Sequence, residues 1–200
     1  MTKRDISGIL KVKVLGDLTN PIIEFANDVE LAENDMDKFD TPFHRRAYVR
    51  ALFAMVEGSV YLLKQTVLSA GVRSRSGLLS VGEYALLIEQ SYDLNKKGEI
   101  NEQVKFLRLP DNLRFTTNCL AKTFDCKLDL GVGGLNWDNF LTAIEIRNRI
   151  THPKSIGEFD ISKQEVELVR SVSYWFNDII AKATQSITEK IAKGSKAKDS

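Results

Sequence analysis

The chain has 200 residues, of which 43% are hydrophobic and 28% are charged. A chain of this length forms one large domain or two small ones, and it can bury roughly 70% of its unfolded surface without disulfides or metals. The formal net charge is +1, so no overall field favours nucleic acid or a membrane, and any anion site has to be local.

Cysteine usage and hydropathy predict a reducing compartment. The two cysteines, Cys119 and Cys126, have neither a Cys nor a His neighbour, so their spacing fits no common zinc site. We expect reduced thiols in or near the core. We find no apolar run of the ~18 residues that a membrane span needs, and residues 1–17 lack the apolar region of a secretion signal. The expectation is a cytoplasmic protein without membrane contact.

Residues 1–40 are predicted to be an N-terminal extension that is partly irregular. Residues 10–15 alternate weakly between apolar and polar, which favours a short extended segment. Residues 16–40 are mixed and acidic, and Pro21 comes early in them. For this segment we therefore expect loop and a short helix.

The strongest predicted helix follows this extension. Thr41 suits the capping position and Pro42 suits the first turn, where no backbone N–H is needed. Gly71 predicts the end of the helix. A single buried face is indicated by residues that recur at three- and four-residue steps: Tyr48, Leu52, Met55, Val56, Ser59, Leu63 and Val67.

Two shorter helices are predicted in the middle of the chain. Ser80 and Glu83 form a capping-box pattern, which opens a helix that runs to about Asp93. A turn and an extended or irregular stretch follow over residues 95–109. Pro110 then starts the next helix.

Two further helices are predicted in the last third of the chain. Asn136 is expected to cap the first, which ends before Pro153. A second capping box, Ser162 with Glu165, opens the last helix, which is expected to reach Ala192 and whose apolar stripe runs from Val169 to Ile187.

Together these elements predict an all-α protein, a four- or five-helix up-and-down bundle with two long helices. Helices that each carry one apolar face have to bury it against one another. We expect the helical domain to span residues 41–192. The Lys- and Ser-rich residues 193–200 are expected to form a disordered basic tail.

The only stretch with plausible chemistry is the end of the helix that precedes Pro153, where Arg147, Asn148 and His152 occur. A guanidinium can bind phosphate through two parallel hydrogen bonds, and an imidazole can move a proton near neutral pH. A helical rise of about 7.5 Å separates positions 147 and 152, so both side chains could reach one phosphate. A structural role is the alternative: Arg147 and Arg149 would neutralise the negative helix end, and His152 would cap a carbonyl.

The order of Arg147, Asn148, three residues and His152, followed by Pro153 and a long last helix, resembles the HEPN superfamily (higher eukaryotes and prokaryotes nucleotide-binding). The resemblance covers residues 41–192 in helix order. It implies a metal-independent endoribonuclease without cofactor, often part of toxin–antitoxin or antiviral defence, that dimerises so that two motifs face each other. Only Arg147, Asn148 and His152 carry over.

In such an enzyme each motif residue has a role. His152 would take the proton from the ribose 2′-OH or protonate the leaving 5′ oxygen, and Arg147 would stabilise charge on the phosphorus. Asn148 would orient a phosphate oxygen or the imidazole. HEPN toxins that pair with a nucleotidyltransferase commonly have Tyr two residues after the His, whereas this chain has Lys154, which argues against that subtype.

Three hypotheses of different kinds remain open from the sequence. The first is a homodimeric ribonuclease with RNA as its substrate and a neutralising partner protein. The second is a catalytically inactive helical module that binds a nucleotide or a protein, and the third is a purely structural subunit. A His152 that lies in a solvent-open dimer cleft favours the first hypothesis, and a His152 buried under packed side chains favours the other two.

Two other motifs are weaker candidates for anion sites. The glycines of residues 131–134 precede a helix and could bind an anion, but they lack the Gly-Lys-Ser/Thr of a P-loop, which favours a plain loop. His44, Arg45 and Arg46 oppose the dipole of their helix, which could mark an acidic or phosphate contact. A solvated surface turn is their commoner explanation.

Glu57 has two explanations. It is the only charged residue between Arg50 and Lys64, and it could reach Arg147 from across the bundle. The three charges are also seven positions apart, which a solvated stripe explains equally well.

Overall fold

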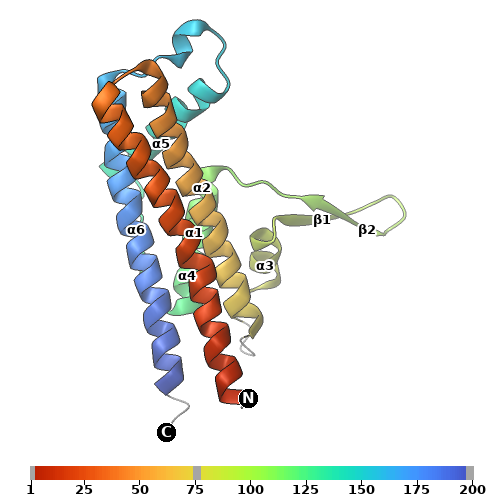
Figure 1. Cartoon of the computed structure of the whole chain (residues 1–200). Helices are drawn as coiled ribbons and strands as arrows, with labels where there is room; N and C mark the ends of the chain where they lie inside the picture. Colours follow the sequence, from red (N-terminus) through yellow and green to blue (C-terminus); the bar gives the residue numbers. More distant parts are fainter. Residues whose placement is uncertain (1–2, 74–77, 197–200) are drawn as a thin grey trace. The chain divides into compact units, whose positions relative to one another are not determined.

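The computed structural model describes residues 3–73 and 78–196, with side chains for residues 15–70 and 78–192. Six α-helices and one two-stranded sheet occur in these residues, so the expected all-α class is confirmed (Figure 1). Three of these helices are long, whereas we expected two. They are α1 (Lys3–Phe39), α2 (Pro42–Arg73) and α6 (Lys163–Lys196).

Helix α1 corrects the extended segment and the loop that we expected before residue 41. Its stripe of Leu18, Val29 and Met36 is buried, with members roughly three and two turns apart. Burying each of these side chains stabilises the fold by roughly 1.5–3 kcal/mol. Pro21 within the helix costs roughly 3 kcal/mol, so the summed burial outweighs it. The widely spaced stripe explains why the sequence pattern missed the helix.

Helix α2 begins as predicted but ends later. The backbone N–H of His44 donates to the Thr41 hydroxyl at 3.4 Å, so Thr41 caps the helix. The helix continues through Gly71 to Arg73. Every residue of the predicted face is buried.

Helix α2 also corrects the expectation that no apolar segment is long enough for a membrane span. Residues Pro42–Ala70 pass by length and composition, with a mean hydropathy of 1.2. This is weak evidence for a span, because the buried core helix of a soluble protein passes the same test, and 56% of the apolar window is buried. Two charged residues of this helix, Glu57 and Lys64, are ion-paired with other elements.

Contacts divide the chain into two compact units. Unit 1 consists of residues 1–15, 60–128 and 186–200, and unit 2 consists of residues 16–59 and 129–185. Each of the long helices contributes residues to both units.

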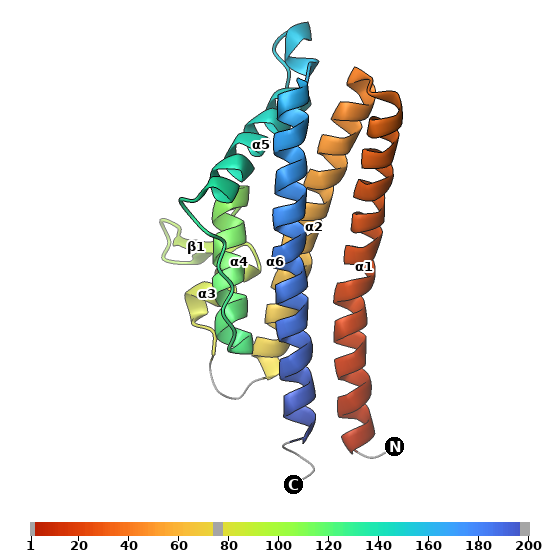
Figure 2. The ribbon, with the colours of Figure 1, turned by 90° about the vertical axis from the view of Figure 1, so that its left-hand side faces the viewer.

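Unit 2 is a helical packing of α1, α2, α5 (Leu135–Thr151) and α6, with the short 3₁₀ helix η1 (Ile156–Phe159). In Figure 1 and Figure 2 its parts of α1, α2 and α6 run alongside one another. A Cβ added to Gly58 of α2 would collide with the Phe25 ring of α1, so these helices are closely packed. Aromatic rings of α5 and α6 also meet in this unit: Trp137, Phe140 and Trp175.

The boundaries of α5 and α6 differ slightly from the prediction. Gly134, not Asn136, occupies the capping position of α5, and its end before Pro153 is confirmed. The capping box of α6 is confirmed, because the Ser162 N–H donates to Glu165 at 2.8 Å and the Glu165 N–H donates to the Ser162 hydroxyl at 3.2 Å. The helix continues to Lys196, so residues 193–196 of the expected disordered tail are helical. Residues 197–200 lie outside the described part of the chain.

Unit 1 contains α3 (Val81–Leu87), β1 (Gln90–Leu94), β2 (Ile100–Val104) and α4 (Leu109–Phe124). The predicted capping box of α3 is confirmed, but the helix ends at Leu87 and not near Asp93. Glu89 adopts a left-handed conformation with φ 59°, which a helix cannot continue through. The chain turns there into β1, which pairs with β2.

The β1–β2 hairpin is two-faced. Because opposite residues of an antiparallel pair share a face, Tyr92, Leu94, Ile100 and Val104 lie on one side with Gln90 and Glu102. The other side is entirely polar: Ser91, Asp93, Asn101 and Gln103. All four apolar side chains are exposed. The predicted turn at 95–98 is confirmed as the turn of this hairpin.

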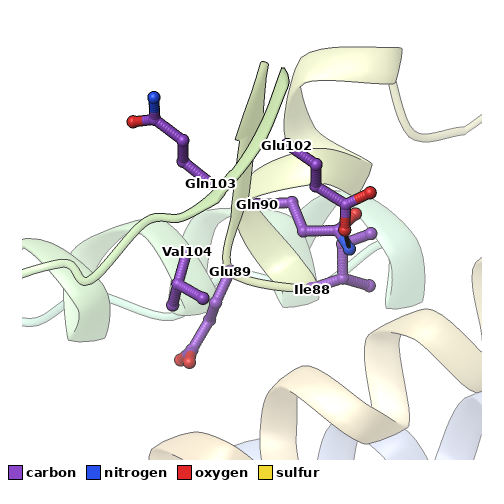
Figure 3. Close-up of a pocket in the computed structure, with 6 residues that line it drawn as sticks. All are labelled: Ile88, Glu89, Gln90, Glu102, Gln103 and Val104. Atoms are coloured by element: carbon purple, nitrogen blue, oxygen red, sulfur yellow. Dashed lines mark hydrogen bonds between the residues drawn. The ribbon is translucent and has the colours of Figure 1, made fainter. Parts of the chain in front are cut away.

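The base of the hairpin is fastened by one ion pair within unit 1. Lys64 of α2 is buried, and its ammonium donates to Glu89 at 3.0 Å. Figure 3 shows that the Glu89 side chain points away from Gln90 and Glu102, which are hydrogen-bonded to each other. These residues line a shallow surface hollow together with Ile88, Gln103 and Val104.

The α3 capping box predicts a pH dependence. The Lys122 ammonium, at 2.8 Å, and then the Ser80 N–H lower the pKa of Glu83 from 4.5 to about 2. A depressed folded-state pKa means that the stabilisation is complete above the unfolded-state value and is lost as the pH falls through the folded-state value. We expect the free energy of unfolding to fall between pH 4.5 and about 2.

Urea unfolding at several pH values across this window tests the expectation. Glu83→Gln should flatten the pH dependence relative to wild type, whereas Glu24→Gln, an exposed change on α1, should leave the slope unchanged. Equal slopes in wild type and Glu83→Gln would show that the contact is absent in solution.

Candidate functional site

The three predicted site residues lie at the end of α5 in unit 2. Arg147 and Asn148 are in the last turns of the helix, and their side chains are hydrogen-bonded at 3.1 Å. His152 is the first residue after the helix, and its backbone N–H donates to the Asn148 carbonyl at 2.9 Å. Arg147 is half-buried, whereas Asn148 and His152 are exposed.

The Arg147 guanidinium is held by two residues of α2. Its Nη2 donates to Glu57 at 2.5 Å, and its Cζ lies 6.0 Å from the centre of the Phe53 ring. Of the two explanations for Glu57, the contact with Arg147 is therefore the one that the structure has. The pairing fixes the guanidinium and neutralises its charge.

The His152 imidazole has no hydrogen-bond partner among the described residues, so it caps no described carbonyl. The side chain is exposed, and Pro153 directly after it fixes the direction in which the chain leaves the helix. The imidazole is therefore accessible to a ligand.

Arg149 has a structural role. Its Nη1 donates to Glu165 at 2.8 Å and its Nη2 donates to the Asp160 carbonyl at 2.8 Å, which joins α5 to the start of α6. Burial raises the pKa of Glu165, but the Arg149 hydrogen bond and the Ser162 N–H outweigh it, so the pKa is lowered overall. Arg149 lies in the last turn of α5, as the structural alternative expects, and it also binds a carboxylate and a loop carbonyl.

The basic residues at the start of α2 bind the segment between α5 and α6. Arg45 pairs with Asp40 at 2.6 Å and donates to the Ile161 carbonyl at 2.7 Å. Arg46 donates to the Phe159 carbonyl at 3.3 Å and lies over the Phe159 ring. The acidic contact that we considered for this motif is present for Arg45. The contacts with the backbone carbonyls were not predicted. The only hint of them in the sequence is that Arg45 and Arg46 lie at a helix start, where their charge opposes the helix dipole.

Arg50 is the site residue that the sequence analysis missed. It is exposed, and its Nη2 donates to the Ile150 carbonyl at 3.4 Å. The sequence marked it only as a member of a charged stripe, because nothing in the pattern identifies a backbone acceptor at Ile150.

The glycines of residues 131–134 form a turn. Gly131 and Gly133 have φ values of 60° and 83°, which other residues rarely adopt. The Gly131 N–H donates to Asp129 and the Gly134 N–H donates to the Gly131 carbonyl. These N–H groups are used inside the loop, as in the plain loop that we favoured.

Among the described residues, the candidate site contains neither a metal-binding cluster nor a cysteine. In the described part of the chain no three His, Cys, Asp or Glu side chains are grouped so that they could hold a metal ion. Cys119 and Cys126 are free, and Cys119 is buried in α4, as we expected of a core thiol. Burial raises the pKa of the Cys119 thiol to about 11.

No family model matches this sequence, and neither a curated protein nor a solved structure matches it.

The two carboxylates that bind α5 arginines should differ in their effect on stability. Glu57→Gln removes one half-exposed pair and should lower the free energy of unfolding by less than about 1 kcal/mol. Glu165→Gln weakens both the Arg149 pair and a capping box, so we expect a larger loss, about 1–2 kcal/mol.

Urea unfolding of the two variants beside wild type gives this ranking directly. A loss for Glu57→Gln that equals or exceeds the loss for Glu165→Gln would contradict it. Glu57 would then be needed to hold the helices of unit 2 together.

Proposed function

We propose that this protein is a metal-independent endoribonuclease of the HEPN type that acts as a homodimer. The observation that carries the proposal is the exposed His152 imidazole, which has no hydrogen-bond partner among the described residues, at the end of the helix that also presents Arg147 and Asn148. A guanidinium, an amide and the imidazoles of two protomers supply the groups that cleavage of RNA by its own 2′-OH needs.

In the proposed reaction the 2′ oxygen attacks the adjacent phosphorus and the bond to the 5′ oxygen breaks. One His152 takes the proton of the 2′-OH, and the His152 of a second protomer gives a proton to the leaving 5′ oxygen. The products are a 2′,3′-cyclic phosphate and a free 5′-OH. Arg147 stabilises the charge on the phosphorus, and Asn148 holds the guanidinium through its amide oxygen.

A catalytically inactive module that binds a nucleotide or a protein is the second candidate. The ion pair between Arg147 and Glu57 favours it, because a neutralised guanidinium binds phosphate less strongly. A toxin–antitoxin or antiviral setting, a neutralising partner protein and a cytoplasmic location accompany the first proposal as expectations from the resemblance.

We expect a dimer at micromolar concentration, because one imidazole in each protomer cannot act as both acid and base in one step. Light scattering should give the mass of two chains. A single-chain mass under conditions in which the protein cleaves RNA would contradict the two-imidazole mechanism.

We expect the protein to cleave single-stranded RNA in the presence of EDTA and to leave a product that ends in a 2′,3′-cyclic phosphate. Arg147→Ala and His152→Ala should each lower the rate at least about a hundredfold, because each removes a group that acts in the transition state. Cys119→Ser in α4 serves as the control and should cleave at the wild-type rate.

Thermal unfolding of the same variants separates chemistry from folding. Both motif variants should keep a midpoint close to wild type, since His152 is exposed and Arg147 is half-buried. Motif variants that remain fully active, or cleavage that requires a divalent metal, would rule the ribonuclease out.

A further inference from the structure

Arg147 is poorly placed to be the only phosphate-binding cation of the site. Its Nη2 is paired with Glu57 at 2.5 Å and its Nη1 donates to Asn148 at 3.1 Å. An incoming phosphate has to compete with a carboxylate for the same guanidinium. In addition, the C-terminal end of α5 carries a partial negative charge, which opposes an anion there.

Arg50 offers a guanidinium without this competition. No carboxylate of a described residue lies within 4.0 Å of it, and its one hydrogen bond to a described residue is long, 3.4 Å to the Ile150 carbonyl. Most arginines of unit 2 are paired with a carboxylate, and Arg46 is packed over a ring. Arg50 is instead exposed and retains unused donors.

The contact with the Ile150 carbonyl brings the Arg50 guanidinium near the backbone of His152. Two residues of chain span at most about 7 Å, so the carbonyl that Arg50 binds lies close to the backbone of His152. A guanidinium at this end of α5 offsets the negative helix end and provides a planar pair of donors that matches a phosphate.

We propose that Arg50 binds the phosphate of an RNA ligand beside His152, an inference that rests on the proposed function and names a phosphate-binding residue of its site. Arg50 then supplies the attraction that the paired Arg147 lacks. Arg147 contributes to the ligand only when the phosphate displaces Glu57 from it.

The probe is a single-stranded RNA of about 12 nucleotides in which every 2′-OH is methylated, so that it cannot be cleaved. Its binding therefore tests the proposal independently of cleavage. Fluorescence anisotropy over a range of salt concentrations gives both the affinity and its salt slope. Arg50→Gln removes the charge while its amide can still donate to the Ile150 carbonyl. We expect about tenfold weaker binding and a salt slope smaller by about 0.7, the value for one phosphate contact on a single strand.

The matched control is Arg114→Ala in α4, which removes the same charge from an exposed arginine of unit 1 and should leave affinity and slope unchanged. Arg50→Lys keeps the charge without the planar donor pair, so it should restore the slope and part of the affinity. If Arg50 only stabilises the helix end, Arg50→Gln will lower the thermal midpoint without changing the salt slope.

Failure of this inference and failure of the proposed function give different results. Wild-type affinity and slope in Arg50→Gln would overturn the role of Arg50, while cleavage that depends on His152 would leave the ribonuclease standing. Binding that depends on Arg50 without any cleavage would support the phosphate site and favour the inactive binding module. A wild-type protein that does not bind the methylated RNA at low salt would overturn the phosphate site.

Discussion

Arginine side chains that donate to backbone carbonyls fix the geometry of unit 2 between α5 and α6. Arg45, Arg46 and Arg50 project from the first turns of α2, and Arg149 projects from α5. Their acceptors are carbonyl groups from Ile150 to Ile161, a segment in which most backbone groups have no regular helical partner. A charged donor on such a carbonyl is worth more than a neutral one and replaces the missing helical bond. These contacts hold the segment between the end of α5 and the start of α6.

The ionisable side chains near the site are of two kinds, those with a carboxylate partner and those without one among the described residues. Arg45, Arg149 and Arg147 each have a carboxylate partner, so their charge is used within the protein. Arg50 and His152 have none among the described residues, and both are exposed. Groups of this second kind are the ones that a ligand meets first.

The features that the sequence predicted are local ones. The caps at Thr41, Ser80 and Ser162 were found because each depends on residues within four positions. Most of helix α1 was missed because its buried residues are few and far apart and because Pro21 lies within it. The predicted end of α3 was wrong because nothing in the sequence pattern indicates that Glu89 adopts a left-handed conformation.

For the candidate site, too, the local features were predicted and the long-range contacts were not. Arg147, Asn148 and His152 were identified from their spacing, and Glu57 was found as one of two explanations. The contacts of Arg46 and Arg50 could not be predicted, because each joins residues about a hundred positions apart and the acceptor is a carbonyl group. Every residue has such a carbonyl, so no residue type identifies it. Only the fold determines which carbonyl groups are left without a helical partner.

The two-faced hairpin of unit 1 raises the question of what aligns its strands. In most sheets a buried face selects the register, because a shift of one residue exchanges the two faces. Here the apolar side chains of both strands are exposed, so burial selects little. The alignment comes from the turn, where the Asn95 side chain accepts the N–H groups of Lys97 and Glu99, and Gly98 has a φ of 76°. Substitutions of the apolar strand residues should therefore leave the register unchanged, whereas substitutions of Asn95 or Gly98 in the turn should disturb it.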